Sequence, residues 1–196
     1  MISTRKFCGL ILGFGACLAF GGTPTFAEAA ADKPQVVLDT TLGKITLELD
    51  PEKAPITVEN FLKYVDDGFY DNLVFHRVIS GFMVQTGGMS DKLVEKHEGQ
   101  RAAIKNESGN GLSNKRGTIA MARTNNPNSA TSQFFINHAD NANLDRAGGG
   151  YAVFGKVIDG LDVVDAIAKV ETTTKGPHGD VPVKPIYIKS ATRVKK

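Results

Sequence analysis

The sequence predicts a mainly β protein in which eight short antiparallel strands form a closed barrel capped by two α-helices. Three observations support this prediction. Several short segments alternate apolar and polar residues or are rich in β-branched and aromatic residues, as strands are. Turn-forming residues separate these segments every 8 to 20 residues or so (about the spacing of a closed antiparallel sheet). Two other segments repeat apolar residues with the period of an amphipathic helix.

The first 29 residues are expected to be a cleaved secretory signal peptide rather than part of this fold. Arg5 and Lys6 precede an apolar run at 7–20, and small residues follow as far as Ala31. A positive start, a short apolar middle and a small-residue end are the three parts of such a peptide. The apolar run is too short for a permanent membrane span.

Two details of this leader stay open. Cleavage after Ala27 and cleavage after Ala29 fit the sequence equally well. Lipid attachment at Cys17 is the alternative to full release, but the residues before Cys17 match a lipidation signal poorly. We expect residues 30–196 to form one released domain.

The composition argues against several classes of partner and cofactor. Both cysteines, Cys8 and Cys17, lie in the leader, so the mature chain needs no disulfide in an oxidising compartment. Loss of Arg5 and Lys6 takes the formal charge from +2 to about neutral, which argues against nucleic acid as a partner. The sequence contains no metal-ligand cluster or phosphate-binding loop. We therefore expect a monomer with no metal, no cofactor and no stable membrane insertion.

The first elements of the domain are a hairpin and a helix. Strands at 36–40 and 44–50 flank a short turn, and the second strand alternates cleanly between apolar and polar residues. Thr57 is expected to cap the helix that follows, and Gly68 to end it. The apolar positions of this helix are Val58, Phe61, Leu62 and Val65.

The segment FHRVISGFMVQTGG, from Phe75 to Gly88, is interpreted as a second hairpin with strands at 75–78 and 82–86. Side chains alternate along a strand, so Phe75 and Arg77 are expected on one face, and His76 and Val78 on the other.

This hairpin brings a guanidinium, an aromatic ring, a thioether and an amide together, on Arg77, Phe82, Met83 and Gln85. A cation beside an apolar surface suits a substrate that is apolar but has a carbonyl to bind. The alternative is an ordinary hairpin in which Phe82 and Met83 fill a core while Arg77 covers its rim.

The later segments supply the remaining strands and the second helix. Strands are expected at 118–122, 132–137, 151–157 and 186–194, and a helix at 161–170. Within the strand at 132–137, Gln133 and Phe135 share one face while Phe134 and Ile136 share the other. One face must be core, so the other presents an amide and a ring to solvent or a ligand. Gly148 to Gly150 and the segment around Gly176, Pro177 and Pro182 are expected to be loops.

Four segments together resemble the cyclophilin-type peptidyl-prolyl cis-trans isomerases, most closely the periplasmic cyclophilins (rotamase A) of Gram-negative bacteria. They are FHRVISGFMVQTGG, GTIAMAR (117–123), SQFFIN (132–137) and AVFGKVIDGLDVVD (152–165), and they match that family in order and spacing. The resemblance covers about residues 36–194. It implies a cyclophilin-like barrel of eight strands with a helix over each open end.

The resemblance also implies an activity and a site. The activity is rotation about X-Pro bonds in unfolded or folding exported proteins, with Arg77 and Gln85 as catalytic residues. The implied substrate-binding residues are Phe82, Met83, Ala122, Arg123, Gln133, Phe135, Leu144 and Tyr151. Gln85 and Gln133 would bind the substrate backbone and help hold Arg77, whereas Ala122 and Arg123 would act through main-chain groups.

The chain departs from many eukaryotic members of the family at Asn143 and Tyr151, where those proteins have tryptophan and histidine. Neither departure removes Arg77 or the apolar pocket, so isomerase activity is still expected. His76 is interpreted as a packed, hydrogen-bonded histidine. A module that only binds proline-containing segments is the competing function, but binding alone would not need the cation of Arg77.

Overall fold

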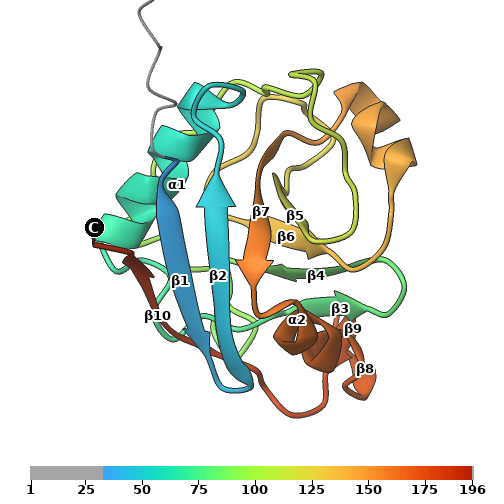
Figure 1. The fold of residues 1–196 in the computed structure, drawn as a ribbon. Helices are drawn as coiled ribbons and strands as arrows, with labels where there is room; N and C mark the ends of the chain where they lie inside the picture. The colour runs from blue at the N-terminus through green and yellow to red at the C-terminus, as the bar shows by residue number, and fades with distance from the viewer. Residues whose placement is uncertain (1–32, 196) are drawn as a thin grey trace, which may run out of the picture. The chain divides into compact units, whose positions relative to one another are not determined.

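The computed structural model describes residues 33–195, so the expected leader at 1–29 lies outside the described residues. Eight of its strands form one antiparallel sheet in the order β10-β1-β2-β7-β5-β6-β4-β3 (Figure 1). Their bounds are Gln35–Thr40 (β1), Gly43–Leu49 (β2), Arg77–Ile79 (β3), Met83–Thr86 (β4), Thr118–Met121 (β5), Phe134–Asn137 (β6), Val153–Asp159 (β7) and Ile188–Arg193 (β10). The predicted mainly β fold with an eight-stranded antiparallel sheet is confirmed.

The sheet curls until the segments that precede its two edge strands meet. These segments form one isolated bridge, between Val74 and Tyr187. Backbone hydrogen bonds support the bridge: Phe75 N donates to Ile186 O at 2.9 Å, and Ile188 N donates to Leu73 O at 2.8 Å. The barrel is therefore closed by irregular chain and not by a regular ladder between β3 and β10.

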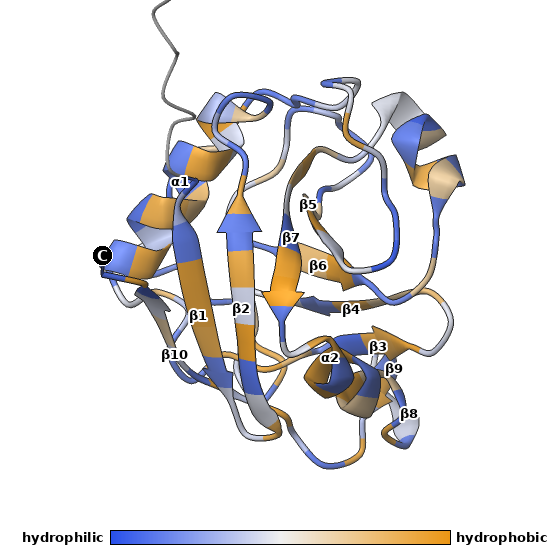
Figure 2. Ribbon diagram, in the orientation of Figure 1, coloured by the Kyte–Doolittle hydropathy of each residue, from blue (hydrophilic) through white to orange (hydrophobic). Residues whose placement is uncertain are grey.

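Two α-helices, α1 (Pro55–Asp66) and α2 (Leu161–Ala168), pack against the sheet, α1 at the upper left of Figure 1 and α2 at the bottom. The predicted apolar face of α1 is confirmed, because Val58, Phe61, Leu62 and Val65 are all buried. Figure 2 shows hydrophobic residues along this helix and along β1 and β2. No helix within residues 33–195 is long and apolar enough to cross a membrane.

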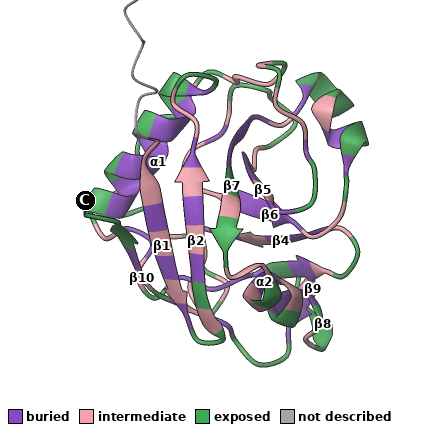
Figure 3. Cartoon of the chain, viewed as in Figure 1, coloured by how far each residue is buried: buried purple, intermediate pink, exposed green. Residues whose placement is uncertain are grey.

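The ring of Phe61 is a centre of the main core. Its centroid lies 5.3 Å from those of Tyr70, Phe134 and Phe154. These rings join the inward residues of β1 and β2, whose alternation between buried and partly exposed residues can be followed in Figure 3. The helix ends where expected, since Gly68 has a φ of 64°, a left-handed conformation that glycine adopts without steric cost.

The predicted cap of α1 is wrong. The helix begins at Pro55, so Thr57 lies inside its first turn, and no side chain of the N-cap residue Ala54 bonds the helix. The carboxylate of Glu107, fifty residues away, accepts the backbone N–H of Ile56 at 3.1 Å and that of Thr57 at 2.8 Å. A distant loop thus satisfies the unpaired N–H groups at this helix start, which no local sequence pattern can indicate.

The segment predicted as a loop around Gly176 contains a second, two-stranded sheet. Its strands are β8 (Thr172–Lys175) and β9 (His178–Pro182). All four residues of β8 are exposed. The strand therefore has no alternation of apolar and polar residues that could predict it from the sequence. Backbone pairing with β9, whose Val181 and Pro182 are buried, makes this hairpin a defined element and places Asp180 next to β3.

The apolar residues lie in two clusters, on opposite faces of the sheet. Phe134 and Ile136 of β6 point into the main core, and Phe135 points into a smaller cluster on the other side. This confirms the expected division of the strand at 132–137. The smaller cluster consists of Met83, Ala120, Phe135, Leu144 and Val153.

The face assignment of Phe75 is wrong. Phe75 and Val78 both lie in the main core, although strict alternation along one strand would put them on opposite faces. The regular strand begins only at Arg77, so the alternation does not extend back to Phe75.

Candidate active site

One row of paired residues crosses five neighbouring strands on the face of the smaller cluster. The Cα partners in this row are Arg77, Gln85, Phe135, Ala120 and Val153. Residues directly opposite one another in a sheet point to the same face. The register therefore places the guanidinium of Arg77, the amide of Gln85 and the ring of Phe135 side by side, although they come from separate parts of the sequence.

A pocket of about 120 Å³ lies over this row. Its lining residues are Arg77, Phe82, Met83, Gln85, Ala122, Arg123, Phe135, Leu144 and Tyr151. The structure thus brings together nine of the ten candidate residues. Met83, Phe135 and Leu144 are buried and form an apolar floor, whereas Arg77 stands exposed at the rim.

Gln133, the tenth candidate, lies on an adjacent hollow of about 310 Å³ that shares Gln85, Ala122 and Arg123 with the first pocket. Gln85 Nε2 donates a hydrogen bond to Gln133 Oε1 at 3.0 Å. Gly88 leaves the space for Gln133, because a Cβ there would lie 2.4 Å from Gln133 Cγ. The two amides therefore fix each other at the junction of the two hollows.

The partner of Arg77 differs from the one expected. Its Nε lies 3.6 Å from Asp180 Oδ2, and both side chains are about half exposed, 45% and 46%. Within residues 33–195, no hydrogen bond links Arg77 to Gln85 or Gln133. Asp180 has a φ of 58°, a left-handed conformation that aspartate tolerates better than most residues. Asp180 could not be predicted from the sequence, because it lies in the polar β8–β9 hairpin, where a loop is expected.

Arg123 makes extensive use of its side chain, which was not expected. Its guanidinium donates to the carbonyl oxygens of Ala147 and Gly148, both at 2.9 Å, and to that of Gly150 at 3.0 Å. Its Nη1 also donates to the carbonyl of Thr124 at 2.9 Å. The planar fork of arginine suits several acceptors at once, whereas lysine offers a point charge.

These hydrogen bonds hold the loop of three glycines against the pocket wall. Gly148, Gly149 and Gly150 have φ values of 56°, 92° and 78°, which only glycine adopts readily. The guanidinium carbon of Arg123 lies 4.2 Å from the centroid of the Tyr151 ring. That ring meets Phe135 edge-on at 5.8 Å. Arg123 therefore links the glycine loop to the aromatic wall of the pocket.

His76 is not a plausible proton donor at neutral pH. It is 5% exposed, and its burial lowers the pKa of the imidazole from 6.5 to about 4. Its Nδ1 has no hydrogen-bond partner among the residues described. The expected packing is confirmed, but the expected hydrogen bond is not found at this nitrogen. Between positions 33 and 195, no three His, Asp, Glu or Cys side chains are grouped to hold a metal ion.

Comparisons with known proteins define the class of this chain. The family model for cyclophilin type peptidyl-prolyl cis-trans isomerase/CLD matches residues 35–193. Peptidyl-prolyl cis-trans isomerase A of Dickeya dadantii is 54% identical over 172 residues, which cover 87% of this chain and 90% of that protein. Peptidyl-prolyl cis-trans isomerase B of Escherichia coli is 49% identical over 162 residues, covering 80% and 98%.

A solved structure agrees with these matches. The crystal structure of a Cryptosporidium parvum cyclophilin type isomerase has a TM-score of 0.70 and 27% identity, covering 84% of this chain and 99% of that one. The chain belongs to the cyclophilin-type peptidyl-prolyl cis-trans isomerases. It is an enzyme that interconverts the cis and trans forms of X-Pro peptide bonds.

Proposed function

We propose that this isomerase acts on exported proteins in the periplasm, after its own leader has been removed, and that Arg77 is its principal catalytic residue. The charged and apolar pattern of residues 1–29 supports export. The lack of cysteine in residues 30–196 suits an oxidising compartment. The expected partners are proline-containing segments of unfolded chains, bound by a monomer.

The chemistry requires no covalent intermediate. Rotation about a peptide bond breaks amide resonance and has a barrier of about 18–20 kcal/mol. In the twisted amide, the proline nitrogen becomes pyramidal and carries a lone pair. A cationic donor aimed at this nitrogen stabilises the transition state and not the planar ground state, as catalysis requires.

In this proposal, Arg77 supplies that donor from the rim while the proline ring lies on the floor formed by Met83, Phe135 and Leu144. Asp180 binds the Nε side of the guanidinium and leaves its terminal nitrogens for the substrate. The Gln85–Gln133 pair lies where the substrate backbone leaves the pocket. Phe82 and Tyr151 would form the side walls of the pocket, and the main chain at Ala122 and Arg123 would contact the residue before proline.

The observation that carries the proposal is the exposed guanidinium of Arg77 in register with an apolar pocket of about 120 Å³. Arg77→Ala is expected to lower kcat/KM by about 10²-fold, or close to 3 kcal/mol of transition-state stabilisation. Arg77→Lys should recover only part of this loss, because lysine lacks the planar fork. A protease-coupled assay on a short proline peptide measures both variants.

Two controls make this test specific. Lys105→Glu alters an exposed charge elsewhere and should keep normal turnover. Circular dichroism should show that both Arg77 variants are folded, and peptide binding should weaken much less than turnover. Normal turnover in folded Arg77→Ala would refute the catalytic role and would favour a protein that only holds proline-containing segments.

A further inference from the structure

A second pocket has a volume of about 400 Å³. This is more than three times the volume of the first pocket, beside Arg77, which is called the proline pocket below. It lies where the loop at 110–115 crosses β2, β5 and β7, and no residue lines both pockets. Its lining residues are Lys33, Glu48, Leu49, Asp50, Gly111, Leu112, Ser113, Lys115, Thr118, Val153, Gly155 and Lys156. A pocket of this size is within the usual range for small-molecule sites.

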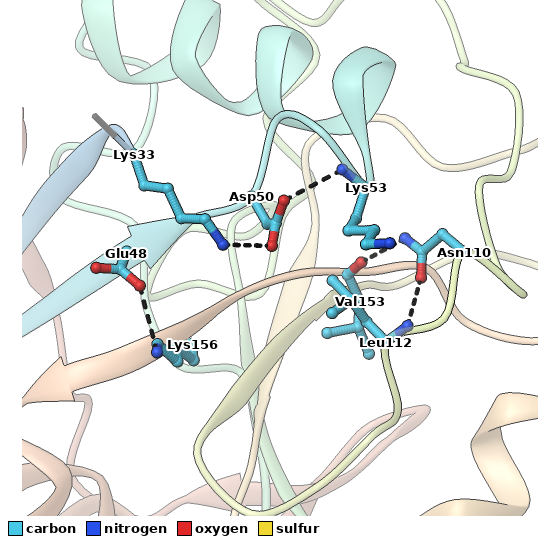
Figure 4. Close-up of polar contacts among 8 residues, drawn as sticks. All are labelled: Lys33, Glu48, Asp50, Lys53, Asn110, Leu112, Val153 and Lys156. Carbon is cyan, nitrogen blue, oxygen red and sulfur yellow. Dashed lines mark hydrogen bonds and ion pairs between the residues drawn. The ribbon is translucent and has the colours of Figure 1, made fainter. Parts of the chain in front are cut away.

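The floor of this second pocket is apolar and its loop is fixed in place. Val153 is 2% exposed and belongs to the smaller cluster, and Leu112 is half-buried beside it. Asn110 accepts a hydrogen bond from Leu112 N and donates one to Val153 O, both at 3.0 Å (Figure 4). The loop is therefore tied to β7, which keeps the Leu112 side chain over the sheet.

Four charged residues around the second pocket form two lysine–carboxylate ion pairs and so neutralise one another. Lys156 Nζ lies 3.3 Å from Glu48 Oε1, and Lys33 Nζ lies 2.6 Å from Asp50 Oδ2 (Figure 4). Asp50 also accepts the backbone N–H of Lys53 at 3.1 Å. Both carboxylates are thus occupied by protein groups and offer little to a ligand cation.

Lys115, unlike the other two lysines of the second pocket, has no ion-pair partner among the described residues. Its side chain is exposed at the edge of the second pocket. The second pocket therefore combines one available cation with an apolar floor. The complementary ligand has one anionic group and an apolar body.

We propose that the second pocket is a ligand site for a small amphiphilic carboxylate. The apolar chain or ring of the ligand would lie on Leu112 and Val153, with its carboxylate towards Lys115. Burial of the apolar part supplies affinity, and the cation selects acids over amines. This site is independent of the proposed role of Arg77.

The second pocket has a structural link to the first. Val153 belongs to the small cluster with Met83 and Phe135, and Leu112 packs against that cluster. A ligand in the second pocket would therefore touch the far side of the apolar wall behind the proline pocket. Its binding should be detectable at the Met83 methyl group as well as at Leu112 and Val153.

A nuclear magnetic resonance titration of the purified protein with octanoate tests the proposal. Saturable shifts are expected at the methyl groups of Leu112 and Val153. Octanoate should bind about tenfold more tightly than either octylamine or acetate, because octylamine lacks the anion and acetate lacks the apolar body. Equal binding of octylamine, or shifts confined to residues remote from the second pocket, would overturn the proposal.

Matched variants complete the experiment. Lys115→Glu should weaken octanoate binding by about tenfold, whereas Lys105→Glu reverses the charge of another exposed lysine and should have no effect. Isomerase turnover without octanoate should be the same in both variants and the unaltered protein. Unchanged octanoate affinity in Lys115→Glu would show that the lysine does not select the ligand.

Discussion

The side chains of Arg123 and His76 show how far the role of a residue depends on what surrounds it. The resemblance to the family implied a main-chain role for position 123, but the guanidinium of Arg123 donates to the carbonyls of Ala147, Gly148 and Gly150. His76 lies one residue from Arg77, yet it is buried and its pKa is lowered to about 4. Each residue leads to a prediction at this scale.

Arg123→Lys should loosen the pocket wall without unfolding the protein. Lysine keeps the charge but cannot serve three carbonyls and stack on Tyr151 together, so we expect a fall in kcat/KM of about threefold to tenfold. Amide hydrogen exchange at Gly148 to Gly150 should become faster in the same variant. Arg146→Lys, a neighbouring exposed arginine, is the matched control and should change neither quantity.

The buried, neutral His76 should make the protein less stable in mild acid. The pKa of His76 is lower in the folded protein than in the unfolded chain, so the unfolded chain binds the proton first as the pH falls from 6.5 towards 4. The contribution of neutral His76 to the free energy of unfolding is present above pH 6.5 and should fall by about 2 kcal/mol between pH 7 and pH 5. Urea unfolding at both pH values measures this loss.

A His76→Gln variant isolates this effect, because glutamine does not titrate and the protein should then lose less stability over the same range. The carboxyl groups with lowered pKa values, such as Asp165, whose pKa is lowered chiefly by its hydrogen bond from Arg116, act at lower pH. An equal loss in His76→Gln and the unaltered protein would assign the pH dependence to other groups.

At the scale of elements, two features depend on contacts between distant segments. The start of α1 is capped by Glu107, and the β8–β9 hairpin carries Asp180 to Arg77. In both cases, a carboxylate from a separate segment satisfies a group that local sequence leaves unpaired. The strength of the first contact can be measured directly.

Glu107→Ala should lower the free energy of unfolding by about 1–2 kcal/mol, as loss of a helix cap does. Thr57 Oγ1 also donates to this carboxylate, at 2.7 Å. Thr57→Ala should therefore cost less in the Glu107→Ala background than alone, which a double-mutant cycle tests. Glu98→Ala removes another exposed carboxylate and is the control. Additive effects of Glu107 and Thr57 would contradict the shared cap.

At the scale of the whole molecule, the sheet separates two kinds of interior. One face encloses the aromatic core around Phe61, and the other carries the small cluster beneath the pocket that Arg77 borders. The candidate site therefore lies on a surface whose backbone is held by the main core behind it. Such support keeps catalytic groups in fixed positions.

Removal of the leader would change the molecule as a whole. Protein purified from periplasmic extract should begin at Glu28 or Ala30 and contain no cysteine, because the proposed export would remove the leader. Intact-mass measurement distinguishes the two start points. A species that retains Met1, or that carries lipid on Cys17, would contradict export with full release.

The sequence by itself determined the class of fold, most strand positions, the buried face of α1 and the division of β6 between two faces. These features depend on local periodicity, which reports the direction of each side chain relative to its own element. The resemblance to the family then indicated the candidate site, and nine of its ten residues line one pocket.

Only the tertiary structure decided the features that join distant segments. They are the Glu107 cap, the β8–β9 hairpin, the Arg77–Asp180 pair and the loop contacts of Arg123. A polar side chain in a sequence can pair with any complementary group that the fold brings near, and periodicity carries no information about that partner. For this reason the helices and strands could be predicted from the sequence, whereas the partners of their polar groups became known only from the fold.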